Sequence, residues 1–390
     1  MIRPIKLLLP GELVDRVDAV LQQGMGGFRT RHSLVEEAIE YYLQELQDLE
    51  RDDFALASPS PAPSSEAPIS EKSQSRTTVA AGGAVSDRDS DDRPLPPSLA
   101  SMERNPQWAN LVRGPATIEE MAISCPSAKA TVSNDSNVST PDQGPILGLH
   151  NRDWPTLKAL EQLGEMSVSG VVLCSDFYNA ATASGWMLGN VLKTYESKGA
   201  GKLSALLPGN REKAKAAESN YRTFALGWIK QSNEGEAVRT SGPIFSWSAV
   251  GLTWRKNALH IGLTESGASL LDGVSGLLPT APHPEDKARF FFSHIAEFGP
   301  SDWLFFQKLL SELFSSPTRN ELVEIIKNSQ NSSGSVAASL VQGYVARGRE
   351  WGLVEQKQQA NRYLLTPFGK DLISDSIELT DGVSQRQASL

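Results

Sequence analysis

Cysteine and long apolar runs are scarce in this sequence. Of 390 residues only two are cysteines, Cys125 and Cys174, and they lie in unrelated contexts. This count excludes a disulfide framework and a zinc ribbon. No window approaches the roughly 18 uninterrupted apolar residues of a membrane-spanning helix, so the expected location is a reducing cytoplasm. The net charge of −9 argues against a generally basic surface but leaves room for local basic patches.

Motifs for catalysis are missing as well. The five histidines have no partner at i, i+3 or i, i+4 that would help hold a metal. The stretch SKGAGKLS departs from the phosphate-loop pattern, because Glu196 stands where that pattern needs glycine. HNRDW brings His150, Arg152 and Asp153 together, but a helix N-cap at Asp153 explains this stretch more simply. We therefore expect a non-enzyme without a cofactor or bound metal.

The first residues, MIRPIKLLLPGELVDRVDAVLQQG, change their period at Pro10. The run of three leucines is too short for a secretion signal, so we expect no targeting segment. Residues 5–9 alternate as in a strand, and residues 12–21 repeat as in an amphipathic helix. The stretch FRTRHSLVEEAIEYYLQEL then restarts the helical period, with Thr30 at the N-cap position.

A strand and two helices within residues 1–48 cannot close a core alone, because a lone strand leaves its backbone hydrogen bonds unmade. A twofold dimer that pairs two copies of the strand solves this problem. The junction IKLLLPGELVDRVD and the helix start TRHSLVEEAI resemble the ribbon-helix-helix family, which includes the CopG, MetJ and Arc repressors. The resemblance implies a homodimer whose paired strands enter the DNA major groove, with the N-terminus of the second helix on a phosphate.

The residues that this resemblance places against DNA include a small basic group. Residues 1–50 carry 5 Lys/Arg against 9 Asp/Glu, but most of the basic side chains lie on the strand or at the start of the second helix. Pro4 and Leu8 replace polar readers on the outward strand face, so we expect mostly phosphate contacts. The candidate contacts are Arg3, Lys6, Leu8, Arg29, Thr30, Arg31 and His32. The alternative is a dimerisation arm that does not touch DNA.

Residues 49–145 change character. They are rich in Ser, Pro, Ala and Asp and contain few large apolar residues. Such a segment buries too little surface to offset the entropy of ordering, so it is predicted to be a disordered acidic linker. Within it, the island QWANLVRGPATIEEMAI is as compatible with a docking helix as with a linker.

From residue 146 the composition is globular, and two similar units follow. In residues 146–280 three helical patterns, the third being EKAKAAESNYRTFALGWIKQ, precede an alternating hairpin; residues 281–390 repeat this plan. The closing phrases HIGLTESGASLL and RYLLTPFGKDLI share Leu-Thr, two residues and Gly, and the helix starts DWPTLKAL and DWLFFQKL share Asp-Trp. These matches predict an internal duplication. The expected fold class is mainly α: a ribbon-helix-helix, a disordered linker and a helical C-terminal body.

Three helices followed by a hairpin that ends in Leu-Thr-x-x-Gly resemble the winged-helix family, most closely in WGLVEQKQQANRYLLTPFGKDL. The resemblance implies that the third helix enters the major groove while the wing touches the flanking backbone. The candidate contacts are Ser335, Ser339, Gln342, Arg347 and Arg349 on the third helix and Lys357, Gln358 and Arg362 on the wing. Many winged helices dock proteins instead of DNA, and this alternative stays open.

Together these patterns predict a homodimeric protein that binds double-stranded DNA as a transcriptional regulator, associated with the nucleoid. Plasmid partition and nucleoid organisation are alternatives within the same class. A non-enzymatic adaptor of a toxin–antitoxin or phage-defence set is the alternative from another class. In that case the C-terminal body binds a partner protein. No membrane partner is expected.

Overall fold

The computed structural model describes residues 96–104, 117–124, 128–133, 139–141, 144–196, 202–209, 211–231 and 238–374. All of them belong to one compact unit that runs from Asp92 to Leu390. The predicted ribbon-helix-helix domain, residues 1–48, lies outside the described residues. Its dimer interface and its DNA contacts therefore stay predictions.

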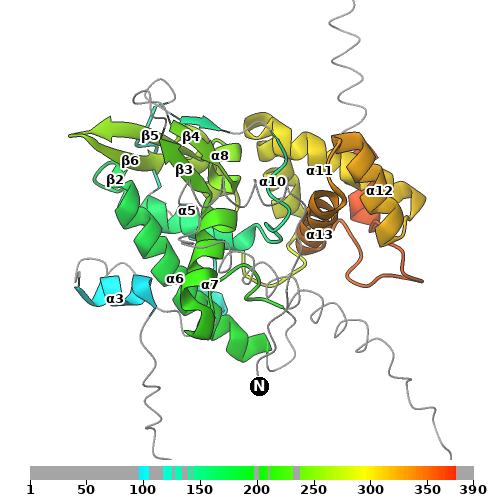
Figure 1. Ribbon diagram of the computed structural model, residues 1–390, viewed down its shortest axis with the longest axis horizontal. Helices are drawn as coiled ribbons and strands as arrows, with labels where there is room; N and C mark the ends of the chain where they lie inside the picture. Colours follow the sequence, from blue (N-terminus) through cyan, green and yellow to red (C-terminus); the bar gives the residue numbers. More distant parts are fainter. Residues whose placement is uncertain are drawn as a thin grey trace, which may run out of the picture. The chain divides into compact units, whose positions relative to one another are not determined.

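The described residues are mainly helical, as predicted, and also form two small three-stranded sheets (Figure 1). The helices are α3 (Pro97–Arg104), α5 (Trp154–Met166), α6 (Cys174–Glu196), α7 (Ala214–Tyr221), α8 (Pro243–Ser246), α9 (Glu265–Gly273), α10 (Glu285–Phe298), α11 (Pro300–Glu312), α12 (Arg319–Gln330) and α13 (Gly334–Glu350). The strands are β1 (Ser139–Pro141), β2 (Val172–Leu173), β3 (Trp228–Gln231), β4 (Val238–Ser241), β5 (Val250–Arg255) and β6 (Ala258–Leu263).

The first predicted unit contains its first two predicted helices, but its third helix is shorter than predicted. α5 starts after Asp153 with proline in its first turn, where the missing N–H removes no helical hydrogen bond. The helix predicted over residues 212–231 is wrong in its last part. α7 passes into a π-helical turn, η5 (Arg222–Leu226), and stops at Gly227, whose φ of +88° strains any other residue. The next residues form β3, which pairs antiparallel with β4.

The second unit contains its three predicted helices, but its two predicted strands are present only as isolated bridges. α11, α12 and α13 occupy the three predicted helical patterns. The predicted capping box opens α12: Thr318 Oγ1 accepts the N–H of Glu321, and the Glu321 carboxylate accepts the N–H of Thr318. After α13 the chain forms a narrow hairpin, held by the bridge between Val354 and Leu365, and then a helix over residues 367–374.

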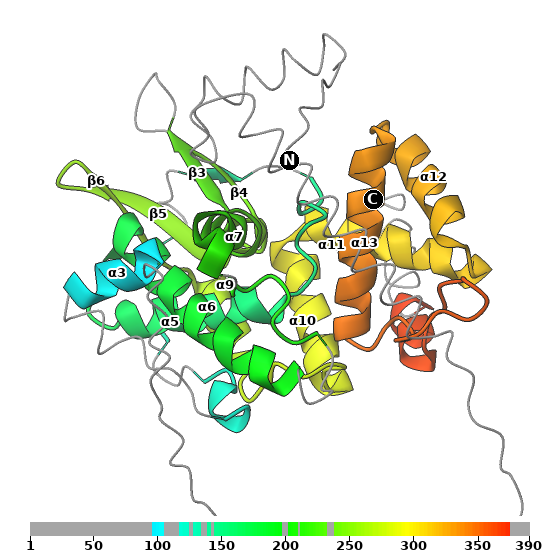
Figure 2. The ribbon, with the colours of Figure 1, turned by 60° about the horizontal axis from the view of Figure 1, so that its bottom comes forward.

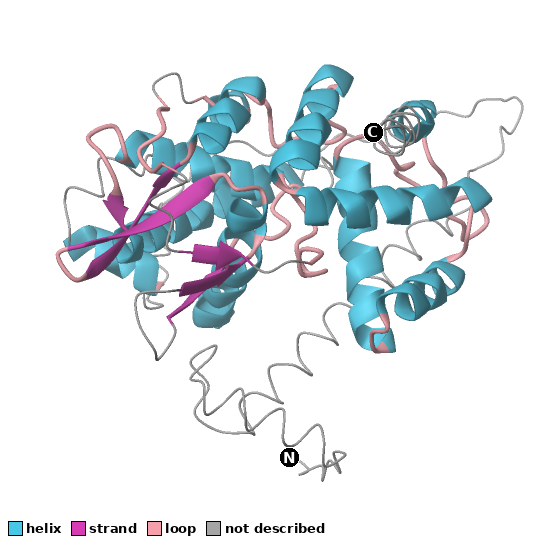
Figure 3. Cartoon of the chain, turned by 90° about the horizontal axis from the view of Figure 1, so that it is seen from above, coloured by secondary structure: helices cyan, strands magenta, loops and turns pink. Residues whose placement is uncertain are grey.

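The strands gather on one side of the described residues (Figure 3). One sheet has the order β2-β6-β5, and its β5–β6 hairpin runs from the pair Val250–Leu263 to the pair Arg255–Ala258. The other has the order β1-β4-β3, with β1 parallel to β4. This second sheet has no counterpart in the second unit among the described residues.

The structure corrects the extent of the predicted linker. Within residues 49–145, Met121 and Ile123 are fully buried, and the Ile123 carbonyl accepts the N–H of Gly276 at 2.7 Å. Val132 is 4% exposed, and its N–H donates to the carbonyl of Leu263. The C-terminal part of the predicted linker thus contributes to the core, and the island predicted over 107–123 docks through its last residues as a short 3-10 turn.

The largest hydrophobic cluster of the described residues joins the two predicted units. It extends along the chain from Met121 to Ile373, and the predicted boundary at residue 280 falls inside it. α10 lies between the strands and α13 in both views of the ribbon (Figure 1, Figure 2). Its Phe291 stacks on Trp351 with ring centroids 4.3 Å apart and meets Trp247 edge-on at 5.3 Å. Aromatic packing of this kind couples the two units mechanically.

Candidate nucleic-acid interface and a buried ionic junction

The outward face of α13 carries most of the candidate contacts that the sequence places on it. Ser335 is exposed, whereas Ser339, Gln342 and Arg349 are half-buried. Arg349 is partly engaged inside the body: its Nε donates to the carbonyl of Glu355 at 3.1 Å, and its guanidinium lies over a tyrosine ring. These side chains offer polar groups, but only Ser335 is fully open.

Arg347 requires a correction. Its side chain is completely buried, so it has no access to DNA in this structure. The guanidinium is held by two aspartates: Nε donates to Asp153 Oδ1 at 2.8 Å, and both Nη atoms donate to Asp302 at 2.8 and 2.9 Å. Both carboxylates raise the pKa of Arg347 well above its usual value, although burial opposes this.

The hairpin after α13, residues 354–365, is an exposed basic wing. Lys357 and Arg362 are exposed. The turn residues Ala360 and Asn361 have positive φ angles of 51° and 59°, as a tight type I′ turn requires. Arg362 Nη1 donates to the carbonyl of Ser316 at 2.8 Å and lies 3.6 Å from the Glu321 carboxylate, while its side chain stays 47% exposed.

The β5–β6 hairpin is a second wing that ends in the same type of turn, although it is a continuous ladder whereas residues 354–365 pair only through isolated bridges. Its turn residues Lys256 and Asn257 have φ angles of 49° and 60°, and the neighbouring Arg255 is exposed like them. Asparagine tolerates this left-handed conformation, and it stands second in both turns. The sequence analysis assigned no DNA contact to this hairpin, although its basic tip is visible in TWRKNALH.

Each wing is anchored at its base by a threonine. After β6, Thr264 Oγ1 accepts the N–H of Gly267 at 3.1 Å and donates to the carbonyl of Ser248 at 2.6 Å. A Cβ on Gly267 would lie 1.9 Å from the carbonyl oxygen of Ala249, so only glycine fits there. Ser248, which follows a buried tryptophan, has a positive φ of 52°.

The C-terminal wing repeats these contacts. Thr366 Oγ1 accepts the N–H of Gly369 at 2.9 Å and donates to the carbonyl of Gly352 at 2.6 Å. A Cβ on Gly369 would lie 2.2 Å from the carbonyl oxygen of Leu353. Gly352 also follows a buried tryptophan and also has a positive φ, 71°. The related Leu-Thr-x-x-Gly phrases of the sequence therefore form the same structure twice.

We name the two duplicated regions the N-terminal repeat (residues 153–273) and the C-terminal repeat (residues 302–374). The following positions match: Asp153 with Asp302, Trp247 with Trp351, Ser248 with Gly352, Thr264 with Thr366, and Gly267 with Gly369. The N-terminal repeat is longer, and its additional residues include β3 and β4.

Asp302, at the start of α11, is the first of two buried carboxylates in what we call the ionic junction. Trp247 Nε1 donates to it at 3.0 Å, and Tyr344 Oη donates at 2.5 Å. Burial alone would raise the pKa of Asp302, but Arg347 and these neutral donors hold it below its usual value. The carboxylate is therefore charged inside the core.

Asp153 occupies the matching place at the start of α5. It accepts hydrogen bonds from Trp351 Nε1 at 2.7 Å, from Arg347 and from His150 Nε2 at 2.7 Å. Asp153 is at the N-cap position, as predicted, but its side chain makes no capping hydrogen bond.

Glu350 extends the ionic junction and does the capping instead. Its carboxylate accepts the N–H groups of Asp153 and Trp154, at 2.6 and 3.2 Å, so it meets the positive end of the α5 dipole. Arg152 donates to it at 3.0 Å, and His283 Nε2 lies 3.4 Å away. Burial opposes the charge, but Arg152 and His283 lower the pKa of Glu350 to about 2.

The ionic junction was not predicted, although the sequence carries a signal for it. The phrase Asp-Trp occurs at the start of both predicted first helices, and a tryptophan precedes both hairpins. The contacts between them join residues far apart in the chain. That the aspartate of each repeat contacts the tryptophan of the other is seen only in the structure.

Other candidate sites have little support in the described residues. No group of three or more His, Cys, Asp or Glu side chains there is placed to hold a metal ion. The candidate DNA-contacting residues of the N-terminal arm, from Arg3 to His32, lie outside the described residues. Cys174, at the start of α6, is half-buried, and burial raises the pKa of its thiol to about 12.

Comparisons with known proteins yield no relative. No family model, no curated protein and no solved structure matches this chain. Among the described helices none is both long and apolar enough to cross a membrane. Function must therefore be argued from the geometry alone.

Proposed function

We propose that this protein binds double-stranded DNA as a homodimeric transcriptional regulator, with contacts from its N-terminal arm and from both wings of the body. The observation that carries the proposal is a pair of wings with exposed basic side chains: Arg255 and Lys256 at the tip of one, and Lys357 and Arg362 beside the tip of the other. Side chains of this kind neutralise phosphates and release counterions, which supplies much of the affinity of DNA-binding proteins.

The plan of three helices, a hairpin and a threonine-capped helix supports a winged-helix role for each repeat. In such a unit the wing meets the backbone beside the groove that the third helix enters. α13 offers Ser335 and Gln342 on its outward face for the groove. Buried Arg347 is excluded from this role, so base reading by α13 is expected to be limited.

The N-terminal arm supplies the second part of the proposal. Its resemblance to ribbon-helix-helix proteins implies a dimer with Lys6 and Arg31 near phosphates. Two arms and two bodies then belong to each dimer. The proposal assigns no catalytic activity and no cofactor to the chain.

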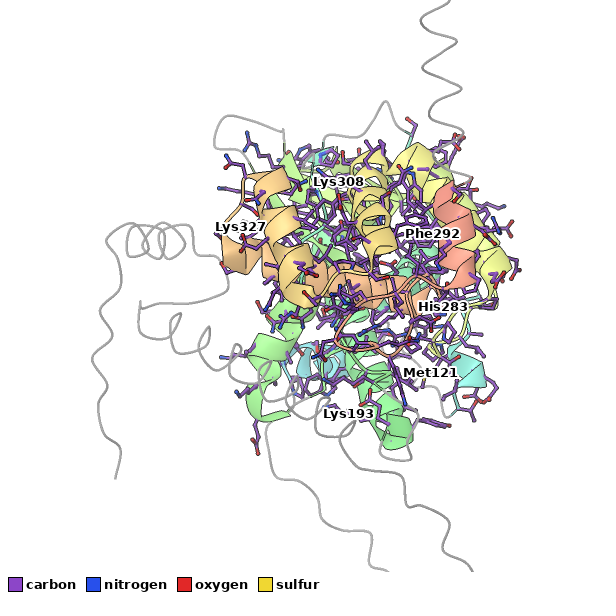
Figure 4. All side chains as sticks on the ribbon, turned by 90° about the vertical axis from the view of Figure 1, so that its right-hand side faces the viewer. Met121, Lys193, His283, Phe292, Lys308 and Lys327 are labelled. Carbon is purple, nitrogen blue, oxygen red and sulfur yellow. The ribbon has the colours of Figure 1, made fainter. Side chains whose placement is uncertain are left out.

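The test measures binding of full-length protein to a fluorescent duplex of random sequence, by anisotropy, over a series of salt concentrations. Lys256→Gln with Lys357→Gln removes one charge from each wing. Lys308→Gln with Lys327→Gln is the matched control, because both lysines belong to helices α11 and α12 and not to a wing, and both side chains reach the surface (Figure 4). Loss of two phosphate contacts from each body, four in the dimer, should lower the slope of log K against log salt by about 4.

The control should keep the wild-type slope. A third variant, Lys6→Ala with Arg31→Ala, measures the contribution of the arm. Wild-type binding by the wing variant would remove the body from the DNA contact. Absence of binding by the wild-type protein at low salt would reject the proposal as a whole.

One observation favours the alternative of a protein-docking adaptor. Leu304, Phe314 and Val336 are large apolar side chains with exposures of 59%, 47% and 46%. Exposed apolar surface often marks a protein contact. In that case Leu304→Ser with Phe314→Ser would abolish partner capture and leave DNA binding unchanged.

A further inference from the structure

The two repeats contact each other reciprocally. Trp247 of the N-terminal repeat donates to Asp302 of the C-terminal repeat, and Trp351 of the C-terminal repeat donates to Asp153 of the N-terminal repeat. Trp247 matches Trp351, and Asp153 matches Asp302. Each repeat therefore uses the same tryptophan to reach the same aspartate of the other.

Reciprocity of this kind identifies the symmetry of the pair. In a head-to-tail arrangement the first repeat would contact the second through one surface and be contacted through another, so a contact would not be returned. When residue i contacts j and j contacts i, the interface is isologous, and the operation that relates the two units is a twofold rotation.

Further contacts agree with this symmetry. The start of α5 is held by Glu350, the residue before Trp351. The start of α11 packs on the matching place in the other repeat: a Cβ on Gly299 would lie 2.8 Å from the carbonyl oxygen of Ser246, the residue before Trp247. Each repeat thus presents its first helix start to the segment before the hairpin of the other.

The symmetry fixes how the wings are presented. A twofold rotation keeps height along its axis and reverses directions perpendicular to it, so matching points of the two repeats lie at the same level on opposite sides of the axis. The type I′ turns, Lys256–Asn257 and Ala360–Asn361, are such matching points. B-DNA has dyads perpendicular to its own axis, and proteins with a twofold axis bind inverted half-sites by aligning the two dyads.

We propose that a single body, residues 92–390, occupies an inverted pair of DNA half-sites, with one repeat on each half. This inference rests on the proposed function. The two halves differ in sequence, because the two tips differ: Arg255-Lys256-Asn257 in one wing and Gln359-Ala360-Asn361 in the other. One chain then supplies the twofold contact that other DNA-binding proteins make as dimers.

The experiment starts with full-length protein and a pool of random-sequence duplexes, from which bound molecules are selected and sequenced. The selected duplex is then footprinted with hydroxyl radicals against three proteins: wild type, Arg255→Gln with Lys256→Gln, and Lys357→Gln with Arg362→Gln. We expect an imperfect inverted repeat. The first variant should lose protection on one side of its centre, and the second variant should lose it on the other side.

The outcomes separate the two proposals. Failure to select any DNA rejects the proposed function and this inference with it. Selected DNA without inverted symmetry overturns this inference alone. Loss of protection on both sides of the centre for each variant also overturns it, because each half-site would then contact a different chain. The inference is also overturned if binding to the inverted repeat depends on Lys6 and Arg31 but not on the wings, because the N-terminal arms would then recognise the repeat.

Discussion

Replacement of Arg347 by methionine is the sharpest test of the ionic junction. Methionine fills much of the arginine volume but leaves Asp153 and Asp302 without the guanidinium that both share. Removal of one partner from a buried ion pair typically costs about 3–5 kcal/mol, because the remaining charge stays in the core. Arg347 is fully buried and serves two carboxylates, so we expect a loss within or above this range at pH 7.

Urea unfolding of the full chain, followed by tryptophan fluorescence, measures this loss. Trp247 and Trp351 are fully buried beside the ionic junction, so their emission reports its exposure. Arg349→Met is the matched control in the same helix. Arg349 is half-buried and contacts a carbonyl and an aromatic ring, so its loss should cost about 1 kcal/mol.

The pH dependence separates charge from packing. In the wild type the pKa of Asp302 is lowered, so its contribution to stability is present above the unfolded pKa and is lost as pH falls through the folded pKa. In Arg347→Met, burial without the cation should raise the pKa of the same carboxylate. The difference in unfolding free energy between variant and wild type should therefore shrink as pH falls from 7 toward 4.

A rescue experiment completes the test. Arg347→Met combined with Asp153→Asn and Asp302→Asn removes the stranded charges and should recover most of the loss, because neutral replacement of a buried ionic group is often tolerated. If the triple variant is as unstable as Arg347→Met, and if the loss is independent of pH, then lost packing rather than stranded charge explains the effect and our reasoning is refuted.

Three further predictions concern other parts of the body. The pKa of Glu350 is about 2 in the folded protein against 4.5 for the free group, so its contribution to the unfolding free energy is present above pH 4.5. This contribution, up to about 3 kcal/mol, should be lost between pH 4.5 and 2. The difference in unfolding free energy between wild type and Glu350→Gln, measured over this range, checks it. Gly343→Ala should cost about 1–3 kcal/mol in urea unfolding, because its Cβ would lie 2.0 Å from the carbonyl oxygen of Gly148, whereas Gly334→Ala in the same helix has free space and should be neutral. Cys174 should react slowly with a thiol reagent at pH 8 in mass-spectrometric mapping, because the raised pKa of its thiol keeps it protonated; rapid labelling would contradict its burial.

The sequence predicts those elements whose signals are local. α12 is found because its capping box and apolar period agree, and the β5–β6 hairpin because its alternation brackets a turn. β3 is missed because its residues continue the apolar period of the preceding helix. Gly227, which ends that helix with a positive φ, reads in sequence as one tolerated interruption.

The ionic junction could not be predicted for a different reason. An aspartate at a helix start, such as Asp153, is usually a cap, and an arginine on the third helix of a winged-helix unit, such as Arg347, is usually a DNA contact. The residues next to each of them in the sequence support these interpretations. A buried charge is stable only when its partners are in place, and here these partners come from distant parts of the chain. A local sequence pattern does not show which distant residues will contact a given charge.

The position of Arg347 also explains why the duplication is faint in the sequence. A side chain between two units related by a twofold axis would meet its own copy, so two arginines would compete for one place. The position matching Arg347, four residues before Trp247, is Pro243. One planar guanidinium with several donors serves both aspartates, and its uniqueness breaks the symmetry that the tryptophans keep. The two repeats therefore differ at the centre of the junction, and the matching residues are those that face each other across it or anchor the wings.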